Sequence, residues 1–253
     1  MNTDYLTLTK QYYAAWLGVA PSFLDRKGVF PVFNSERDER QRGHSARIDL
    51  YCFVSQGTAI ISYGQRLQKD IGRVESCFRQ EKALEDTKAS LSECLGVRPG
   101  HSYKYYFREL RQGLNTTLAR QLTRNDYGDF LHFHRSLYPD GDQESWLEEY
   151  FNAIADKGYV HGVYVDERLV SATDAPDMPY MADVIVEIGV NTLPEFRRRG
   201  HAKAVVGASL KHLVNTEKVP IWSCGAANTA SQELAESVGY VKFADVIGVT
   251  LQS

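Results

Sequence analysis

The segment from residue 184 to residue 213 places the strongest limits on the fold of this chain. The apolar run Val184 to Val190 reads as a buried strand, and Gly200 to Leu213 has apolar residues at helical spacing. Between them lies the arginine-rich turn Arg197-Arg198-Arg199-Gly200. A buried strand that enters a helix through a short turn is typical of a sheet with helices packed on its faces.

The same turn predicts a site for an anion. A helix that begins at Gly200 directs unpaired backbone N–H groups and the positive end of its dipole at whatever precedes it. Gly200 permits close approach, the small Ala202 keeps the first turn clear, and Arg198 and Arg199 add positive charge. Each charge-assisted hydrogen bond contributes about 1.5–3 kcal/mol, so several together hold a phosphate. The alternative is a solvated, arginine-rich helix start.

The rest of the chain alternates strand and helix patterns, which predicts an α/β fold with a mixed (α+β) sheet. In the first half we expect a helix at 3–17, a hairpin at 46–63, one helix over 72–95 and a packed aromatic strand around 103–107. In the second half we expect strands at 120–123, 158–165, 169–175, 184–190, 220–224 and 241–250, and helices at 126–138, 143–155, 200–213 and 229–238. We place a boundary near Leu114, between an accessory α/β region (1–113) and a second domain (114–253).

Charge and composition favour a small-molecule partner. The 253 residues carry a formal net charge of −3 from 29 basic and 32 acidic side chains that are well mixed, so no large field attracts nucleic acid or an anionic membrane. No apolar stretch approaches the roughly 18 residues of a membrane span, and the start lacks a signal-peptide pattern. We therefore expect a cytoplasmic protein. The four cysteines lack C-x-x-C spacing, and no metal site is expected.

Two blocks of residues resemble the GNAT superfamily of N-acetyltransferases. The pattern R-x-x-G-x-A at Arg197 to Ala202, which follows a strand and Pro194-Glu195-Phe196, resembles motif A of that superfamily. The segment from Asn228 to Tyr240 resembles its N-x-x-A-x-x-L-Y-x-x-x-G-F block, in the order and at the distance expected after a strand. The resemblance covers about Leu114 to Ser253 and implies a GNAT-like acyltransferase fold for that part.

The resemblance also implies a site for acetyl-CoA as cosubstrate. The strand at 188–190 would splay from its neighbour at 222–224, and its backbone would pair with the pantetheine arm. The residues implied in cofactor binding are Ile188, Gly189, Val190, Arg197, Arg198, Arg199, Gly200, His201, Ala202 and Asn228. Asn228 is equally suited to be the N-cap of the following helix, and His201 to be a plain surface residue.

GNAT enzymes transfer the acetyl group directly from the thioester to an amine, so the resemblance implies no metal. An alkyl ammonium with a pKa of about 10.4 costs about 4.6 kcal/mol to deprotonate at pH 7. A general base is therefore useful. Glu187 is our candidate because it is acidic within the apolar run 184–190. Its alternative is a strand carboxylate on an open face or paired with an arginine. Asp183, at the strand start, is a weaker candidate.

The candidate proton donor departs from the family pattern. Many GNAT enzymes carry a tyrosine after the helix leucine, where this chain has Ala235. Ser231, one turn earlier, is the candidate donor through its hydroxyl or a water, or else a small packing residue. Cys224 is not expected to act as a nucleophile, because direct transfer needs none.

These observations predict acetyl transfer from acetyl-CoA to a small-molecule amine. The missing tyrosine keeps an alternative open, a non-catalytic acyl-CoA-binding or sensor module. Acetylation of a protein amine also stays open.

Overall fold

The chain is a mixed α/β protein in a computed structural model that describes residues 4–41, 47–79, 83–141 and 146–252. The strands are β1 (Gly28–Phe33), β2 (Leu50–Ser55), β3 (Thr58–Tyr63), β4 (Gly100–Phe107), β5 (Ala119–Gln121), β6 (His161–Val165), β7 (Arg168–Asp174), β8 (Ile185–Glu187), β9 (Gly189–Thr192), β10 (Val219–Gly225) and β11 (Tyr240–Val249). The helices are α1 (Tyr5–Leu17), α2 (Ile71–Phe78), α3 (Leu84–Leu95), α4 (Tyr127–Leu137), α5 (Leu147–Asp156), α6 (His201–Asn215) and α7 (Thr229–Val238).

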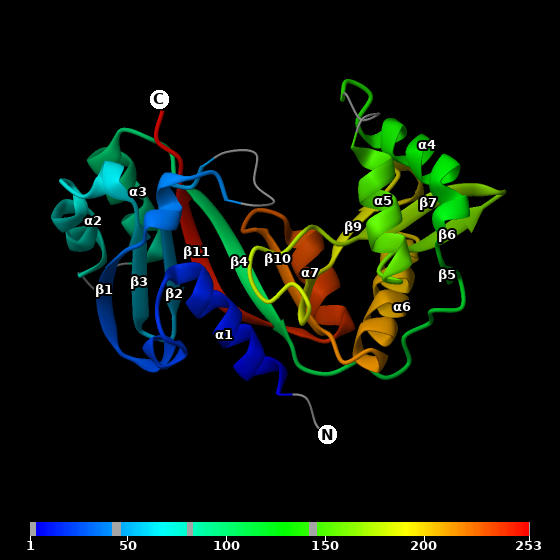
Figure 1. Cartoon of the computed structure of the whole chain (residues 1–253), viewed down its shortest axis with the longest axis horizontal. Helices are drawn as coiled ribbons and strands as arrows, with labels where there is room; N and C mark the ends of the chain where they lie inside the picture. The colour runs from blue at the N-terminus through cyan, green and yellow to red at the C-terminus, as the bar shows by residue number, and fades with distance from the viewer. Residues whose placement is uncertain (1–3, 42–46, 80–82, 142–145, 253) are drawn as a thin grey trace.

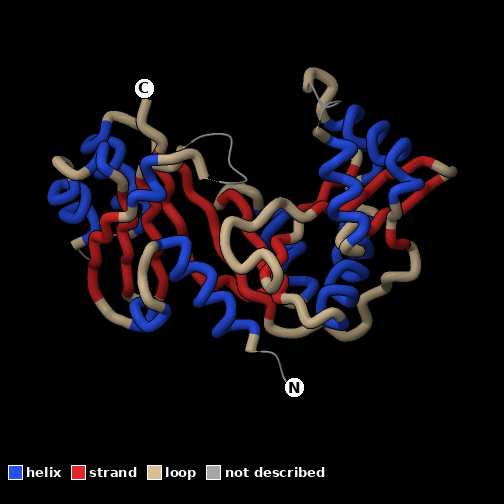
Figure 2. Tube along the Cα trace, viewed as in Figure 1, coloured by secondary structure: helices blue, strands red, loops and turns tan. Residues whose placement is uncertain are grey.

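The strands form two sheets that lie next to each other. The larger sheet has the order β1-β3-β2-β11-β4-β10-β8, and the smaller one has the order β5-β6-β7-β9. In Figure 1 the larger sheet occupies the left and centre, α1 crosses it, and α4, α5 and α6 surround the smaller sheet on the right. Figure 2 shows the same arrangement by element type. The β1–β3 and β8–β10 pairs are parallel and the other pairs are antiparallel.

The two sheets part where β8 passes into β9. β8 pairs with β10 as far as Glu187 opposite Ile221, and the Ile188 N–H still bonds the Ile221 carbonyl at 3.3 Å. From Gly189 onward the chain pairs with β7 instead, beginning at Asp174. The predicted single strand at 184–190 is therefore two strands in two sheets. The splay expected from the GNAT resemblance is present in the backbone.

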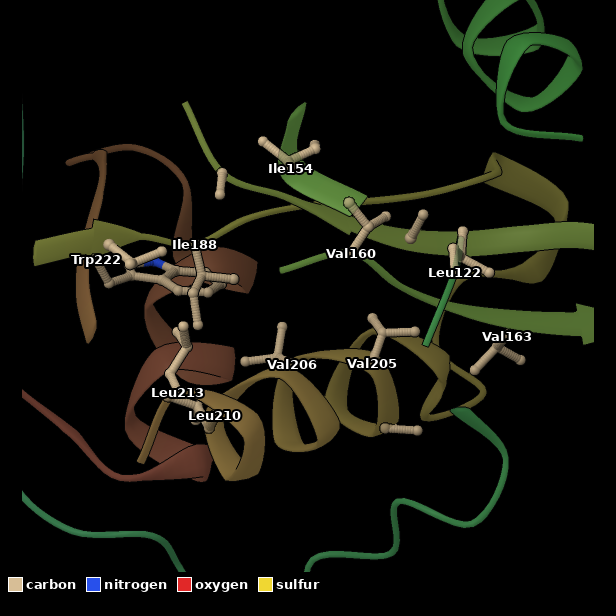
Figure 3. Close-up of a cluster of buried hydrophobic side chains, with 14 of the residues drawn as sticks. Leu122, Ile154, Val160, Val163, Ile188, Val205, Val206, Leu210, Leu213 and Trp222 are labelled. Atoms are coloured by element: carbon tan, nitrogen blue, oxygen red, sulfur yellow. The ribbon is translucent and has the colours of Figure 1, made fainter. Parts of the chain in front are cut away.

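Apolar residues on both faces of the larger sheet hold the elements of this fork in place. On one face, Ile188 and Trp222 pack with α6 residues such as Val206 and Leu210, as Figure 3 shows. Each fully buried side chain of this kind stabilises the fold by about 1.5–3 kcal/mol. On the other face, Ile185, Val219 and Ile221 pack under α1. Since side chains alternate along a strand, Glu187 shares the α1 face with Ile185.

Two elements of the first half differ from the sequence prediction. The single helix expected over 72–95 is wrong: α2 ends at Phe78, and Ala83 is extended (φ −58°, ψ 149°) before α3 starts. Strand β1 was missed because Pro31 lies inside it. Proline is tolerated there because β1 is the edge strand, paired only with β3 within the described residues.

The other elements are confirmed with small shifts at their ends, as far as they lie in the described residues. The expected starts of the helix at 3–17, the hairpin at 46–63 and the helix at 143–155 lie outside the described residues. The aromatic strand is β4, with Tyr105 and Phe107 buried in the core as expected. β4 lies between β10 and β11, so the segment before Leu114 contributes directly to the sheet that carries the fork. The division into 1–113 and 114–253 stays a prediction. None of the helices in the described part of the chain has the length and apolar character needed to cross a bilayer.

Candidate active site

The turn before α6 is open at the place where the sequence predicts an anion. Gly200 is the N-cap of α6 with φ +82°, in the left-handed region that favours glycine. A Cβ built at Gly200 would meet no atom within 4 Å. The N–H of Ala204 bonds the Gly200 carbonyl at 3.0 Å, so the N–H groups of the three residues before Ala204 have no partner within the helix. The space in front of this helix end therefore suits an anion.

The three arginines of the turn are exposed, and two of them are held by neighbours. Arg197 Nε donates to the Thr192 carbonyl at 3.1 Å, which ties the turn to the end of β9. The Arg199 guanidinium lies 5.4 Å from the centre of the Phe196 ring. His201 is half-buried, and its Nδ1 has no hydrogen-bond partner among the described residues. The turn thus presents cationic groups beside the open N–H groups.

Glycine is also required at the fork itself. A Cβ at Gly189 would overlap Asp174 Oδ1 on the paired strand β7. The backbone of Gly189 and Val190 pairs with β7 and not with β10. On β10, Ser223 and Cys224 pair with β4. Backbone edges on both sides of the fork are therefore not bonded to each other, as the splay requires.

Glu187 occupies the last paired position of β8 and has a defined partner. Ser223 Oγ on β10 donates a hydrogen bond to Glu187 Oε1. Neither alternative from the sequence describes this carboxylate, because its partner is a serine and it lies half-buried on the face covered by α1.

Tyrosines surround Glu187 on this face. Burial raises the pKa of Tyr12 and Tyr13, both on α1, and the negative charge of Glu187 raises each of them further. Burial also raises the pKa of Tyr51 on β2, where Arg37 opposes the shift and Glu187 adds to it. Glu187 therefore lies near three buried tyrosines on this face.

A second carboxylate, Asp174, lies across the fork at the end of β7. Burial raises its pKa to about 6, while His134 opposes the shift and Glu187 adds to it. Asp174 lines a cavity of about 190 Å³, together with His134 on α4 and Asn191 on β9. Two carboxylates thus flank the point at which the sheets separate. Asp183, the weaker candidate for the base, lies before β8 and is exposed.

The residues at the start of α7 hold one another. Asn228 Oδ1 accepts the Ser231 N–H at 3.1 Å, so Asn228 is the N-cap of α7. Ser231 Oγ accepts the Trp222 Nε1–H at 3.1 Å. Ala235 is fully buried. Burial raises the pKa of the Cys224 thiol next to Ser231, which disfavours the thiolate that a nucleophile needs.

Several polar residues near Glu187 were missed by sequence reasoning. They are Tyr12, Tyr13, Tyr51, Lys104, Asp174 and Ser223. One signal was present, because Lys104 interrupts the aromatic run 103–107, much as Glu187 interrupts an apolar one. The tyrosines carry no such signal and look like ordinary core residues.

Solved structures share this fold. A GNAT-family acetyltransferase from Colwellia psychrerythraea is 18% identical over 60% of this chain and 56% of its own, with a TM-score of 0.50. A putative GNAT acetyltransferase from Novosphingobium aromaticivorans is 20% identical over 62% and 66%, with a TM-score of 0.47. The aminoglycoside N-acetyltransferase AAC(6')-Iy, solved with a CoA-containing bisubstrate analogue, is 20% identical over 49% and 90%, with a TM-score of 0.42. The first two matches cover less than two thirds of those proteins.

The fold class is therefore that of acetyltransferases with a split sheet. A family model described as GNAT acetyltransferase matches residues 87–245, well over half of the sequence. The chain belongs to the GNAT acetyltransferase family, as the two sequence blocks indicated. The match starts before Leu114 and includes β4. No protein of curated function matches the sequence significantly.

Proposed function

We propose that this chain transfers an acetyl group from acetyl-CoA to the amine of a small molecule. One observation carries the proposal: the parting of β8–β9 from β10 lies beside the open first turn of α6. A nucleotide tail with a long thioester arm needs both features at once. Membership of the GNAT family supports an acyltransferase.

The residues at the fork suit acetyl-CoA chemically. The backbone N–H groups of His201 and Ala202, which follow Gly200, would bind the pyrophosphate. The side chains of Arg197, Arg198 and Arg199 would add positive charge. The backbone of Ile188, Gly189 and Val190 would pair with the pantetheine arm, and Asn228, at the start of α7, would lie beside that arm. When bound, acetyl-CoA supplies an acetyl group activated as a thioester.

The proposed role of Glu187 is to take a proton from the acceptor ammonium, directly or through a water. The nitrogen lone pair then forms the new C–N bond to the acetyl carbon, while the C–S bond breaks and the sulfur leaves with its electron pair. The hydrogen bond from Ser223 fixes the direction of the carboxylate. General-base catalysis of this kind contributes about 10²–10⁴ in rate.

The leaving sulfur needs a proton, and the nitrogen of the new amide must lose one. Ser231 is the proposed donor: it would give its hydroxyl hydrogen to the sulfur and regain a hydrogen from that nitrogen, directly or through a water. Its Oγ accepts from Trp222 Nε1, and its O–H donates to the Cys224 sulfur, a contact that it would give up to reach the leaving sulfur. Cys224 lies next to it on the same side of β10. A water held by Ser231 would serve equally well for this step.

Release of free thiol from acetyl-CoA tests the proposal. We expect thiol release that depends on one class of small amine, with an acetylated product found by mass spectrometry. Binding of acetyl-CoA without thiol release for any amine would instead favour a binding or sensor module, the reading that the buried Ala235 keeps open.

A further inference from the structure

A lysine, Lys104, stands on the α1 face of the larger sheet and makes no hydrogen bond or ion pair with the residues that the structure describes. Lys104 lies on β4, opposite Ser223 on β10 and Ala244 on β11. Its side chain as a whole is half-buried. The Lys104 ammonium is not fully buried, so it borders open space.

Lys104 belongs to the same row of side chains as Glu187. Residues directly opposite each other in an antiparallel pair share a face, so Lys104 is on the face of Ser223, which bonds Glu187. The row therefore reads carboxylate, hydroxyl, ammonium across β8, β10 and β4. Burial lowers the pKa of Lys104, and the charge of Glu187 opposes that shift.

Tyrosine hydroxyls face the same region. The rings of Tyr12, Tyr13 and Tyr51 are buried, but their hydroxyls make no hydrogen bond with the described residues and border open space. The fully buried Arg37 fixes this wall: its guanidinium lies 4.7 Å from the Trp16 ring and 5.4 Å from the Tyr51 ring. The region thus offers the Lys104 ammonium, the Arg37 guanidinium behind the Tyr51 ring and several hydroxyl donors, all suited to the oxygens of an anion.

We propose that Lys104 binds a carboxylate carried by the acceptor, so that the acceptor is an amino-acid-like molecule with both an amine and a carboxylate. The proposal rests on the function above, because Glu187 receives the ammonium end. The Glu187 carboxylate would face the ammonium of such a zwitterion, and the Lys104 ammonium would face its carboxylate. An amine without an anion would bring no negative group to the half-buried Lys104 ammonium. A polycation would place positive charge next to it.

Matched pairs of probes test this directly. The acid probes are glycine, 4-aminobutyrate, 6-aminohexanoate, L-phenylalanine and L-lysine, and each is compared with the amine that lacks its carboxylate. Binding is measured by calorimetry in the presence of CoA, and turnover by thiol release. For at least one pair we expect the acid to bind at least tenfold more tightly than its amine, with a KM lower by a similar factor.

Substitutions assign the preference to Lys104. Lys104→Met should remove it, and Lys104→Arg should keep most of it. Lys104→Gln, which retains polarity, serves if Lys104→Met does not fold. Lys242→Met is the matched control, because Lys242 lies on β11 with its ammonium over the Tyr103 ring and paired with Asp245.

Three results would overturn the proposal. The first is a wild-type protein that binds none of the probes, and the second is one that binds each acid and its amine equally. The third is a Lys104→Met variant that keeps the preference for the acid, while its kcat and pH profile change equally for the acid and the amine of a pair. The last result would mean that Lys104 acts only on Glu187. A Lys104-dependent preference in binding without any thiol release would support the carboxylate site and contradict the acetyl-transfer function.

Discussion

Ser223 on β10 donates a hydrogen bond to Glu187 on β8, at the end of the stretch where those two strands pair. One residue further on, the Ile188 N–H makes its bond to β10, and then the chain joins the other sheet. The hydrogen bond thus fixes a carboxylate at the mouth of the fork. Its position on the α1 face separates it from the apolar side chains that pack against α6.

Replacing Glu187 with glutamine should lower kcat at pH 7 by about 10²–10⁴. The amide keeps the shape of the carboxylate and can still accept from Ser223, but it cannot take a proton. The loss should shrink at pH 9, where more of the amine is already neutral. Rate profiles over pH 6–10 measure this, with the exposed Glu148→Gln on α5 as control. An equal loss at both pH values would remove Glu187 from the role of base.

Replacing Ser231 with alanine should affect both stability and turnover. The Trp222 Nε1–H would lose its acceptor, and an unsatisfied buried donor costs about 1–3 kcal/mol, so we expect the melting temperature to fall by several °C. Ser231→Thr keeps the hydroxyl and should recover most of the loss. If Ser231→Ala lowered stability but left kcat unchanged, the serine would be a structural residue and the proton donor would lie elsewhere.

Asp174 makes the stability of the fold depend on pH. Because its folded-state pKa is raised to about 6 from an ordinary value of 3.8, the stabilising contribution of its protonated form is full below pH 3.8. It is lost as the pH rises through about 6. Asp174→Asn should therefore raise the unfolding free energy at pH 7.5 by about 1–3 kcal/mol.

Thermal melts of the wild type and Asp174→Asn at pH 3.5, 5 and 7.5 measure this effect. The two proteins should melt alike at the lowest pH and separate as the pH rises, with the variant more stable. A variant that is less stable than the wild type at pH 7.5 would contradict the assigned shift.

The local part of the site was predictable because its physics is local. A glycine between a strand and a helix sets the open helix end by itself, and an acidic residue in the apolar run 184–190 marks Glu187 without any knowledge of its neighbours. The N-cap role of Asn228 follows from the residue type in the same way.

The proposed acceptor side was not predictable because it depends on strand order. Lys104 is far from Glu187 in the sequence and comes near it only because β4 lies beside β10. Tyr12 and Tyr13 reach the same region through the packing of α1. Hydrophobic periodicity shows that these segments are strands or helices, but it does not show which of them become neighbours.

Calorimetric binding of acetyl-CoA to Gly200 variants tests the central claim most directly. Asparagine and aspartate have nearly the same shape, and asparagine tolerates the left-handed backbone of Gly200, so the pair differs mainly in charge at the proposed phosphate site. Gly113→Asp, at another left-handed glycine with open space around it, is the control. We predict affinity close to wild type for Gly113→Asp, a modest loss for Gly200→Asn and at least a thirtyfold loss for Gly200→Asp. Equal affinities of Gly200→Asp and Gly200→Asn would contradict phosphate binding at this turn.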